Sequence, residues 1–370
     1  MCIFMGDITG KNFQVMTWGE SHGPAIGAVI SGCPPGLELD LQKDIQFHLD
    51  RRKPGQSIIT TQRKEKDIAE IESGVFRGMT TGTAIAIRIK NQDARPEDYE
   101  QITNVPRPNH ADFTYEDKYG IRDPAGGGRS SNRIFAAYVA AGAIAKKFLY
   151  ERHGIEIVGY VQQVKDLVGK IDRDSVSVVD VEKNIVRCPD TDMAEKMIEL
   201  IKKTRSEGNS LGGIVGCVIR NVPVGLGEPL ADKLQADLSK AMFTIGAAHG
   251  FDYGSGFDSV NMTGEQNNDL FYFAEGGKVK TRTNYSGGIQ GGVSNGMPIY
   301  FKVGFKPTAT ISKPQQSINL TTREEEMLMP KGRHDPCVLP RAVPNVESMA
   351  ALVLADHSII RYGNARIRIN

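Results

Sequence analysis

Hydrophobic and polar residues alternate in several short segments of the chain, and β-branched residues are frequent in these segments. The pattern predicts strands, which we expect at residues 25–31, 83–90, 213–221 and 297–305. A longer segment, 132–152, is rich in alanine and has apolar residues at helical spacing. Because Gly154 follows it, this segment predicts a helix. A second helix of the same kind is expected near 346–361.

The order of these elements and a weak internal repeat indicate the fold class. Helices and strands do not alternate strictly, which favours an α+β protein with antiparallel sheets and helices between or beside them. Residues 21–37 resemble residues 210–226, and a helical pattern follows both copies. Chance similarity of glycine-rich hairpins is one explanation, and a duplicated unit is the other. We predict a single domain over 1–370, with repeat halves of about 10–200 and 200–370.

Composition excludes several classes of protein. The 45 basic and 44 acidic residues give a net charge of +1, without the basic excess of a general nucleic-acid binder. No apolar run is long enough to cross a bilayer and no secretory signal opens the chain, so we expect a soluble cytoplasmic protein without a membrane partner. The five cysteines are odd in number and scattered, which indicates free thiols rather than disulfides.

The segment GGGRSSNR at 126–133, directly before the predicted helix, is the first candidate for chemistry. The dinucleotide, P-loop, metalloprotease and serine-hydrolase signatures are all missing. Glycines let the backbone approach an anion, a helix N-terminus directs free N–H groups toward it, and Arg129 and Arg133 add positive charge. The serines could instead be ordinary N-caps. Three glycines and two arginines exceed what a cap needs, which favours binding of a phosphate or carboxylate.

Three further loops combine histidine with other reactive side chains. A lone histidine is more often structural than catalytic, although its pKa suits proton transfer near neutral pH. The loops are GESHG at 19–23 with Ser21 and His22, PRPNHAD at 106–112 with His110, and GRHDPC at 332–337 with Asp335.

Two other hypotheses have less support. Cys337 could be a nucleophile, or could bind zinc with His334 and Asp335, but residues adjacent in sequence rarely converge on one metal, and no metal is predicted. The basic run RRKPG at 51–55 is either a solvated charged face or, with the arginines of the other loops, part of a pocket for a substrate with several negative charges.

Taken together, these segments resemble chorismate synthase, the last enzyme of the shikimate pathway. The resemblance covers nearly the whole chain, from about Gly10 to His357, and so many blocks in one order are not expected by chance. The matching blocks are GESHG at 19–23, PPG at 34–36, RRKPG at 51–55, GGGRSSNR at 126–133, GLGEP at 225–229, GGIQGG at 287–292, KPT at 306–308 and GRHDPC at 332–337.

The resemblance implies a lyase that eliminates phosphate from 5-enolpyruvylshikimate 3-phosphate to give chorismate. The family requires reduced FMN, although the reaction has no net redox change. A substrate with one phosphate and two carboxylates explains arginine-rich loops in a neutral chain. The resemblance also implies a β-α-β sandwich with helices between two antiparallel sheets, pseudo-twofold symmetry and a homotetramer.

The same resemblance assigns residues to roles. It implies that His22 acts on the leaving phosphate, that His110 acts on the reduced flavin, and that Asp335 helps the flavin to remove the substrate proton. Ser21 and Ser131 assist Asp335. The residues implied to line the FMN site are Arg129, Ser130, Ser131, Gly246, Ala247, Gly291, Lys306, Pro307, Thr308, Ala309, Thr310 and Arg333, and those implied to bind substrate anions are Arg52, Arg107 and Arg133.

The chain departs from the family pattern at four positions. Ile58 stands where arginine is usual, Asn109 replaces a glycine, Asn132 an alanine and His249 a lysine. Because none of these residues is assigned to chemistry, we expect an active enzyme. An FMN- and substrate-binding homologue with impaired turnover, and an unrelated hydrolase that uses Cys337 or Ser21, are the alternatives. The reductant also stays open, between NADPH used directly and an external flavin reductase.

Overall fold

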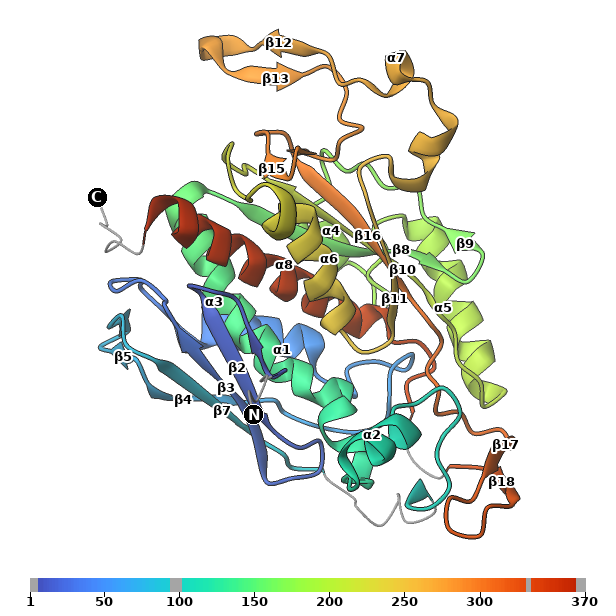
Figure 1. Cartoon of the computed structure of the whole chain (residues 1–370). Coiled ribbons are helices and arrows are strands. Elements are labelled where there is room, and N and C mark those ends of the chain that lie inside the picture. The colour runs from blue at the N-terminus through green and yellow to red at the C-terminus, as the bar shows by residue number, and fades with distance from the viewer. Residues whose placement is uncertain (1–5, 94–101, 331–333, 364–370) are drawn as a thin grey trace.

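The computed structural model describes residues 6–93, 102–330 and 334–363. Two five-stranded antiparallel sheets enclose a layer of helices (Figure 1). The first sheet has the order β1 (Ile8–Thr9), β2 (Gln14–Gly19), β3 (Ala25–Ser31), β7 (Ile85–Lys90) and β4 (Ala69–Ser73). The second has the order β11 (Ala248–Tyr253), β16 (Ile299–Phe305), β10 (Gly213–Arg220), β8 (Glu156–Val164) and β9 (Leu167–Val168).

Four helices fill the space between the sheets. They are α1 (Phe47–Arg52), α3 (Phe135–His153), α6 (Leu234–Thr244) and α8 (Leu339–Tyr362), and α3 packs along α8 (Figure 1). Small residues allow this close approach: a Cβ on Gly142 of α3 would lie 2.3 Å from Cβ of Ser348 on α8. Because sheets cover both sides of this layer, α3 and α8 are buried around most of their circumference and have no single apolar face.

Shorter elements surround this sandwich, and the candidate site lies among them. They are β5 (Val75–Phe76), β6 (Met79–Thr80), α2 (Asp112–Tyr119), α4 (Val178–Val181), α5 (Thr191–Ser206), α7 (Gly264–Asn267), β12 (Phe271–Phe273), β13 (Val279–Thr281), β14 (Ile289–Gln290), β15 (Val293–Ser294), β17 (Gln315–Ile318) and β18 (Glu325–Leu328). In the described part of the chain, no helix is both long and apolar enough to cross a membrane.

The fold confirms the predicted α+β sandwich with helices between two antiparallel sheets. All four predicted strands are present, as β3, β7, β10 and β16, with ends that differ by up to two residues. The two copies of the internal repeat supply β3 and β10, each the central strand of its sheet. The division into one domain with two repeat halves stays a prediction.

The two predicted helices begin at other residues than expected. A 3₁₀ turn, Asn132–Ile134, precedes α3, which starts at Phe135. Helix α8 starts at Leu339, seven residues before the predicted start. Pro340 and Pro344 obscure this start in the sequence. Pro340 is well tolerated because it lies in the first turn, where its missing N–H has no intrahelical partner, whereas Pro344 lies further inside the helix.

Candidate active site

The turn formed by Gly126, Gly127 and Gly128 is the centre of the candidate site. All three glycines have positive φ, at 63°, 81° and 51°. A Cβ on Gly126 would lie 2.2 Å from Nδ1 and Cε1 of His22, and one on Gly127 would lie 2.9 Å from Cε1 of His110. Glycine is therefore required for two reasons: the backbone conformation is left-handed, and two histidines pack against the backbone where a side chain would be.

His110 is held by a buried carboxylate. Nδ1 of His110 lies 2.9 Å from Oδ1 of Asp112, and the Arg107 guanidinium donates to both oxygens of Asp112 at 2.7 and 2.8 Å. Burial by itself would raise the pKa of Asp112, but the hydrogen bonds from Arg107 and His110 hold it well below its usual range. The tautomer of His110 with its proton on Nδ1 donates a hydrogen bond to Asp112, and in this tautomer Nε2 is the ring atom available to a ligand.

His22 lies on the other side of the triple-glycine turn, beside Ser21. Ser21 is buried, and its hydroxyl and carbonyl oxygens lie 3.4 and 3.1 Å from the guanidinium of Arg63. Burial lowers the pKa of His22, and the positive charge of Arg63 lowers it further. Burial also lowers the pKa of His110, and its hydrogen bond to Asp112 offsets only part of this effect. Both imidazoles are therefore neutral at neutral pH.

We expect the protein to lose stability as the pH falls below 6.5. Burial lowers the pKa of four histidines in the folded chain, which are His22, His48, His110 and His153, the last to about 4. Between the ordinary histidine pKa of 6.5 and these lowered values, the unfolded chain therefore binds more protons than the folded one. The midpoint of thermal unfolding should therefore decrease between pH 7 and pH 5. The variant His153→Gln should show a smaller decrease than the parent. A midpoint that is constant or rises over this range would contradict the burial of these imidazoles.

Asp335 connects two segments that are distant in sequence. Its Oδ1 accepts a hydrogen bond from the backbone N–H of Thr61 at 2.8 Å, and its Oδ2 accepts one from Nη1 of Arg341, with which it forms an ion pair. The backbone carbonyl of Asp335 accepts the Thr308 hydroxyl at 2.8 Å. The first turn of α8, the loop that contains Thr61 and the segment after β16 therefore meet at Asp335.

The arginines predicted to bind substrate are buried. Arg52, Arg107 and Arg133 have exposed fractions of 0%, 6% and 3%. Arg52 and Arg133 both donate to Asp67 and lie behind the wall of the pocket, whereas Arg107 lies in that wall and donates to Asp112 and Thr310. Burial lowers the pKa of Arg52 to about 9, and the charge on Arg341 contributes to this effect. Behind the pocket, Arg52, Arg133 and Arg341 lie close together, and the carboxylates of Asp67, Glu65 and Asp335 pair with them.

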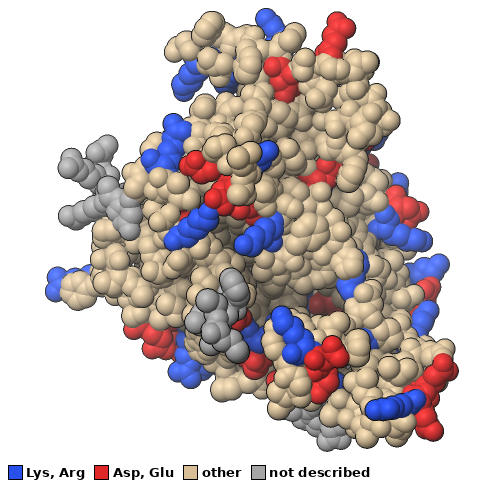
Figure 2. All heavy atoms as spheres, in the orientation of Figure 1, with Lys and Arg blue, Asp and Glu red and all other residues tan. Residues whose placement is uncertain are grey.

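A pocket of about 500 Å³ lies between the triple-glycine turn, the C-terminal end of α6 and the segment after β16. In Figure 2 the molecule is hollowed in this region. The residues from the sequence prediction that line it are Arg107, His110, Arg129, Ser130, Ser131, Gly246, Ala247, Lys306, Thr308, Ala309, Thr310 and Asp335. Pro307 lies between two lining residues, and Ser21 and His22 approach from behind Gly126.

The predicted FMN residue Gly291 is not brought to this pocket. Gly291 lies beside Gly292, whose carbonyl accepts the N–H of Leu234 at the N-terminal end of α6, and the pocket adjoins the opposite end of that helix. Arg333 lies outside the described residues.

Asn109 has a φ of 58°, so asparagine takes the left-handed conformation of the glycine that it replaces. At Ile58, the carbonyl accepts a hydrogen bond from Arg205 of α5.

The sequence prediction did not assign Asp112, Asp67 or Arg341. Asp112 could have been found, because it is two residues from His110 in a loop stiffened by proline. No local pattern marks Asp67 or Arg341 as part of the site.

Cys337 is fully buried and burial raises its pKa to about 12, so the thiol is a poor nucleophile. Among the described residues, no group of histidine, cysteine or acidic side chains is placed to hold a metal.

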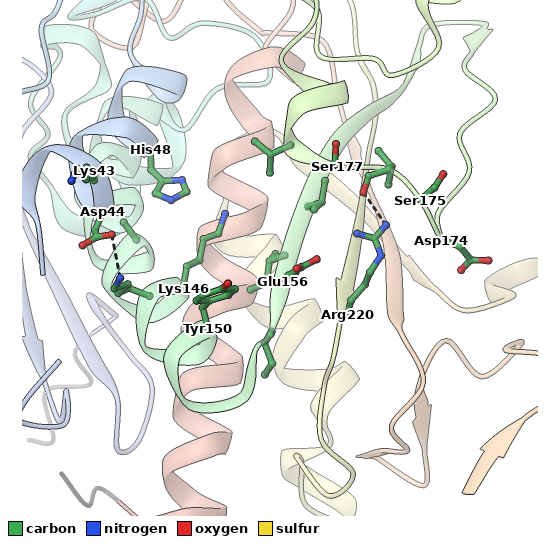
Figure 3. A pocket seen from close by; sticks show the side chains of 17 residues that line it. Lys43, Asp44, His48, Lys146, Tyr150, Glu156, Asp174, Ser175, Ser177 and Arg220 are labelled. Atoms are coloured by element: carbon green, nitrogen blue, oxygen red, sulfur yellow. Dashed lines mark hydrogen bonds and ion pairs between the residues drawn. The ribbon is translucent and has the colours of Figure 1, made fainter. Parts of the chain in front are cut away.

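A second cavity, of about 660 Å³, lies between α1, α3 and the strands β8 and β10. Figure 3 shows its charged side chains in two groups, with Lys43, Asp44, His48 and Lys146 on one side and Arg220 on the other. Lys146 pairs with Glu347 at 2.9 Å, and Arg220 donates to two backbone carbonyls. None of the predicted site residues lines this cavity.

The fold and the pocket define an enzyme class: a helix-filled β-sandwich whose site offers imidazole, carboxylate and guanidinium groups to a small anionic substrate. A family model described as chorismate synthase matches residues 13–359. The chorismate synthase of Gloeothece citriformis is 57% identical over 98% of this chain and 99% of its own length, and that of Trichormus variabilis is 54% identical over 98% and 100%. A solved structure, titled as the crystal structure of chorismate synthase, superposes with a TM-score of 0.72 at 29% identity and covers 96% of this chain and 94% of its own.

The chain therefore belongs to the chorismate synthase family. Its activity is that of a carbon–oxygen lyase acting on a phosphate, in the shikimate pathway of aromatic amino acid biosynthesis.

Proposed function

We propose that the pocket binds reduced FMN together with 5-enolpyruvylshikimate 3-phosphate, and that His22, His110 and Asp335 are its catalytic side chains. One observation carries this proposal: His22, His110 and the pocket wall with Asp335 all lie next to the triple-glycine turn. Together with the turn, these groups come from four separate segments of the chain, and convergence of this kind is typical of an active site.

The lining residues suit a flavin mononucleotide. The pocket volume lies within the range of small-molecule sites. Phe135, Ile245 and Val338 offer apolar surface to a ring system, while Arg129 and Lys306 offer positive charge to a phosphate. When bound, reduced FMN would supply an electron-rich ring whose N5 can accept the proton that leaves the substrate.

His22 is proposed to give a proton to an oxygen of the leaving phosphate. A phosphate that leaves without a proton or a cation carries the full developing charge and is a poor leaving group. His22 is neutral in the free enzyme at neutral pH because burial and Arg63 lower its pKa. A bound phosphate dianion opposes both effects, since it stabilises the imidazolium form. We therefore infer that His22 takes up its proton as the substrate binds.

His110 and Asp335 are proposed to act on the other side of the turn. Asp112 keeps the proton of His110 on Nδ1, so Nε2 can accept a proton from the reduced flavin or hold one near it. Asp335 is held by Thr61 and Arg341, which fix its carboxylate at the pocket wall. There it assists removal of the substrate proton, together with the hydroxyls of Ser131 and Ser21.

The substrate anions are proposed to be balanced by Arg52, Arg107 and Arg133. Arg52 and Arg133, which both donate to Asp67, act from behind the wall, since their side chains expose almost no surface. Arg107 acts from within the wall. An anion in the pocket would relieve the repulsion between Arg52 and Arg341 that contributes to the lowered pKa of Arg52.

Binding of the flavin can be tested without turnover. Lys306→Ala should raise the dissociation constant of reduced FMN about tenfold, because the change removes a partly buried cation from the pocket wall. The dissociation constant would be measured anaerobically by fluorescence titration. Lys202→Ala on α5 is the matched control, since Lys202 is exposed and pairs only with Glu199 among the described residues. Equal affinity in Lys306→Ala and in the parent would place the flavin elsewhere.

The assembly is proposed to be a homotetramer in the cytoplasm. Gly291 is implied to contact FMN but lies at the far end of α6 from the pocket of its own chain. A neighbouring copy could supply it, and light scattering would give the mass in solution.

Electrons for the flavin are proposed to come from an external reductase, and consumption of NADPH by the purified chain with FMN would instead indicate direct reduction.

A further inference from the structure

Residues 254–285 leave the second sheet after β11 and form a projecting arm, at the top of Figure 1. The arm contains α7 and the hairpin of β12 and β13. Its two ends are held together by the N–H of Ser255, which donates to the carbonyl of Tyr285 at 2.8 Å. Among the described residues no third strand pairs with the hairpin, and an isolated two-stranded hairpin is only marginally stable in water.

The hairpin has one apolar and one polar face. Phe271, Phe273 and Val279 share a face and have exposed fractions of 64%, 80% and 52%. On the opposite face Tyr272 pairs with Lys280, and the Arg282 guanidinium lies over the Tyr272 ring at 5.5 Å. Alternation of this kind normally buries one face of a sheet. Thr281 also lies on this face and is buried, but the three apolar side chains are left uncovered by the described parts of the chain, as is typical of a surface that contacts another molecule.

A groove of about 720 Å³ lies at the other end of the molecule, between β2 and α2. Its apolar lining includes Met16, Trp18, Tyr119 and Ile121, all of them partly exposed. The groove also adjoins the triple-glycine turn, since Gly127 lines it. Because arm and groove lie at opposite ends in Figure 1, the arm cannot fill the groove of its own chain.

The groove carries an excess of negative charge. Four carboxylates line it, those of Asp7, Glu20, Asp112 and Asp123, against two arginines, Arg122 and Arg129, and Asp112 is already paired with Arg107. Both arginines already pair with carboxylates, Arg129 with Asp7 at 2.7 Å and Arg122 with Glu116 at 3.3 Å. Oε2 of Glu20 is buried, and it has no hydrogen-bond partner among the described residues. A cation that entered the groove would therefore find a carboxylate still to be paired.

The hairpin carries the opposite charge. Residues 271–282 hold Lys278, Lys280 and Arg282 against the single carboxylate of Glu275. Lys278 and Lys280 are exposed and make no ion pair within the described parts of the chain. Figure 2 shows the arm as largely uncharged surface that carries both basic and acidic atoms, with basic atoms toward the end of the hairpin. The hairpin and the groove therefore match in apolar character and in charge, whereas the rest of the arm adds the carboxylates of Asp258, Glu265 and Asp269 and no basic residue.

We propose that the arm of one copy of this chain docks in the groove between β2 and α2 of a second copy. Two copies that lie side by side in opposite directions exchange arms in this way, which gives a closed pair with twofold symmetry rather than an open filament. The inference rests on the proposed oligomer and adds to it. Gly254 at the root of the arm contacts Gly287, so the exchange would carry the segment of Gly291 toward the active site of the partner.

Cross-linking between two variants tests this arrangement. Chains with Phe273→Cys and chains with Tyr119→Cys, both in a Cys2→Ser background, are co-expressed and treated with a short bismaleimide. The described native cysteines are buried, so the introduced thiols react first. We expect a covalent dimer that contains one chain of each kind. Phe76→Cys is the matched control for Tyr119→Cys, because Phe76 is similarly exposed and lies on β5, away from the groove.

Each other outcome overturns the proposal. Links between two Phe273→Cys chains would indicate that arms pair with each other. An oligomer by light scattering without the mixed link would overturn arm exchange but leave the proposed oligomer standing, whereas a monomer would overturn both. As a second measurement, the double change of Phe271→Ser and Phe273→Ser should raise the dissociation constant of the oligomer roughly a hundredfold, and Phe76→Ser should leave it unchanged.

Discussion

Replacing His110 by alanine should lower kcat by about 10²- to 10⁴-fold and change the dissociation constant of reduced FMN far less. The expected size is that of a lost general acid or base. His110 touches the pocket, and its ring is oriented by Asp112 through Nδ1. His22→Ala should have an effect of the same size, because the leaving phosphate would depart without its proton. Both variants would be measured anaerobically with saturating reduced FMN.

Two further variants separate chemistry from folding. Asp112→Asn keeps the size of the side chain but removes the charge that holds the proton on Nδ1 of His110, so it should lower kcat and shift its pH profile. His153→Gln is the control, because His153 lies at the end of α3 and bonds only Ser358 among the described residues. If His22→Ala and His110→Ala reduced flavin affinity and turnover equally, both histidines would have a structural role.

Gly126→Ala should abolish most of the activity. A methyl group at this position would lie 2.2 Å from two atoms of the His22 ring, so either the ring or the turn must move. The residue also has a φ of 63°, where alanine is strained by about 1–2 kcal/mol. We expect kcat to fall by at least about a hundredfold, since small displacements of catalytic groups have effects of this size.

Gly154→Ala separates the two causes of that loss. Gly154 ends α3 with a φ of 68°, and a Cβ there would meet no atom within 4 Å. It therefore carries the backbone strain of Gly126→Ala without the collision. Thermal unfolding should show both variants destabilised, with activity lost only in Gly126→Ala. Full activity in Gly126→Ala would mean that His22 does not need the position seen in this structure.

Strand β16 and helix α8 illustrate what the sequence alone could predict. In β16 every second residue is buried, so alternation located the strand to within two residues. In α8 nearly all residues are buried between two sheets, so no periodic pattern marks the first two turns, and the prolines there suggest a loop. Periodicity is informative only where one side of an element faces water.

The candidate site divides in the same way. The glycines and histidines stand in short motifs, and the resemblance carried by those motifs led to the pocket residues. The burial of Arg52 and Arg133 could not be predicted, because it depends on Asp67, which has no motif of its own. Gly291 shows the opposite case: a motif was found, but its distance from the pocket becomes visible only in the fold.

The most direct test of the account is phosphate release from 5-enolpyruvylshikimate 3-phosphate under anaerobic conditions. FMN would be reduced with dithionite, and oxidised FMN would be the control. We predict phosphate release only with reduced FMN, with an equal amount of chorismate formed. If flavin bound but no phosphate were released, the chain would be a binding homologue without turnover, and Ile58→Arg would be the first change to examine. Release at the same rate with oxidised FMN or without flavin would contradict the proposed chemistry outright.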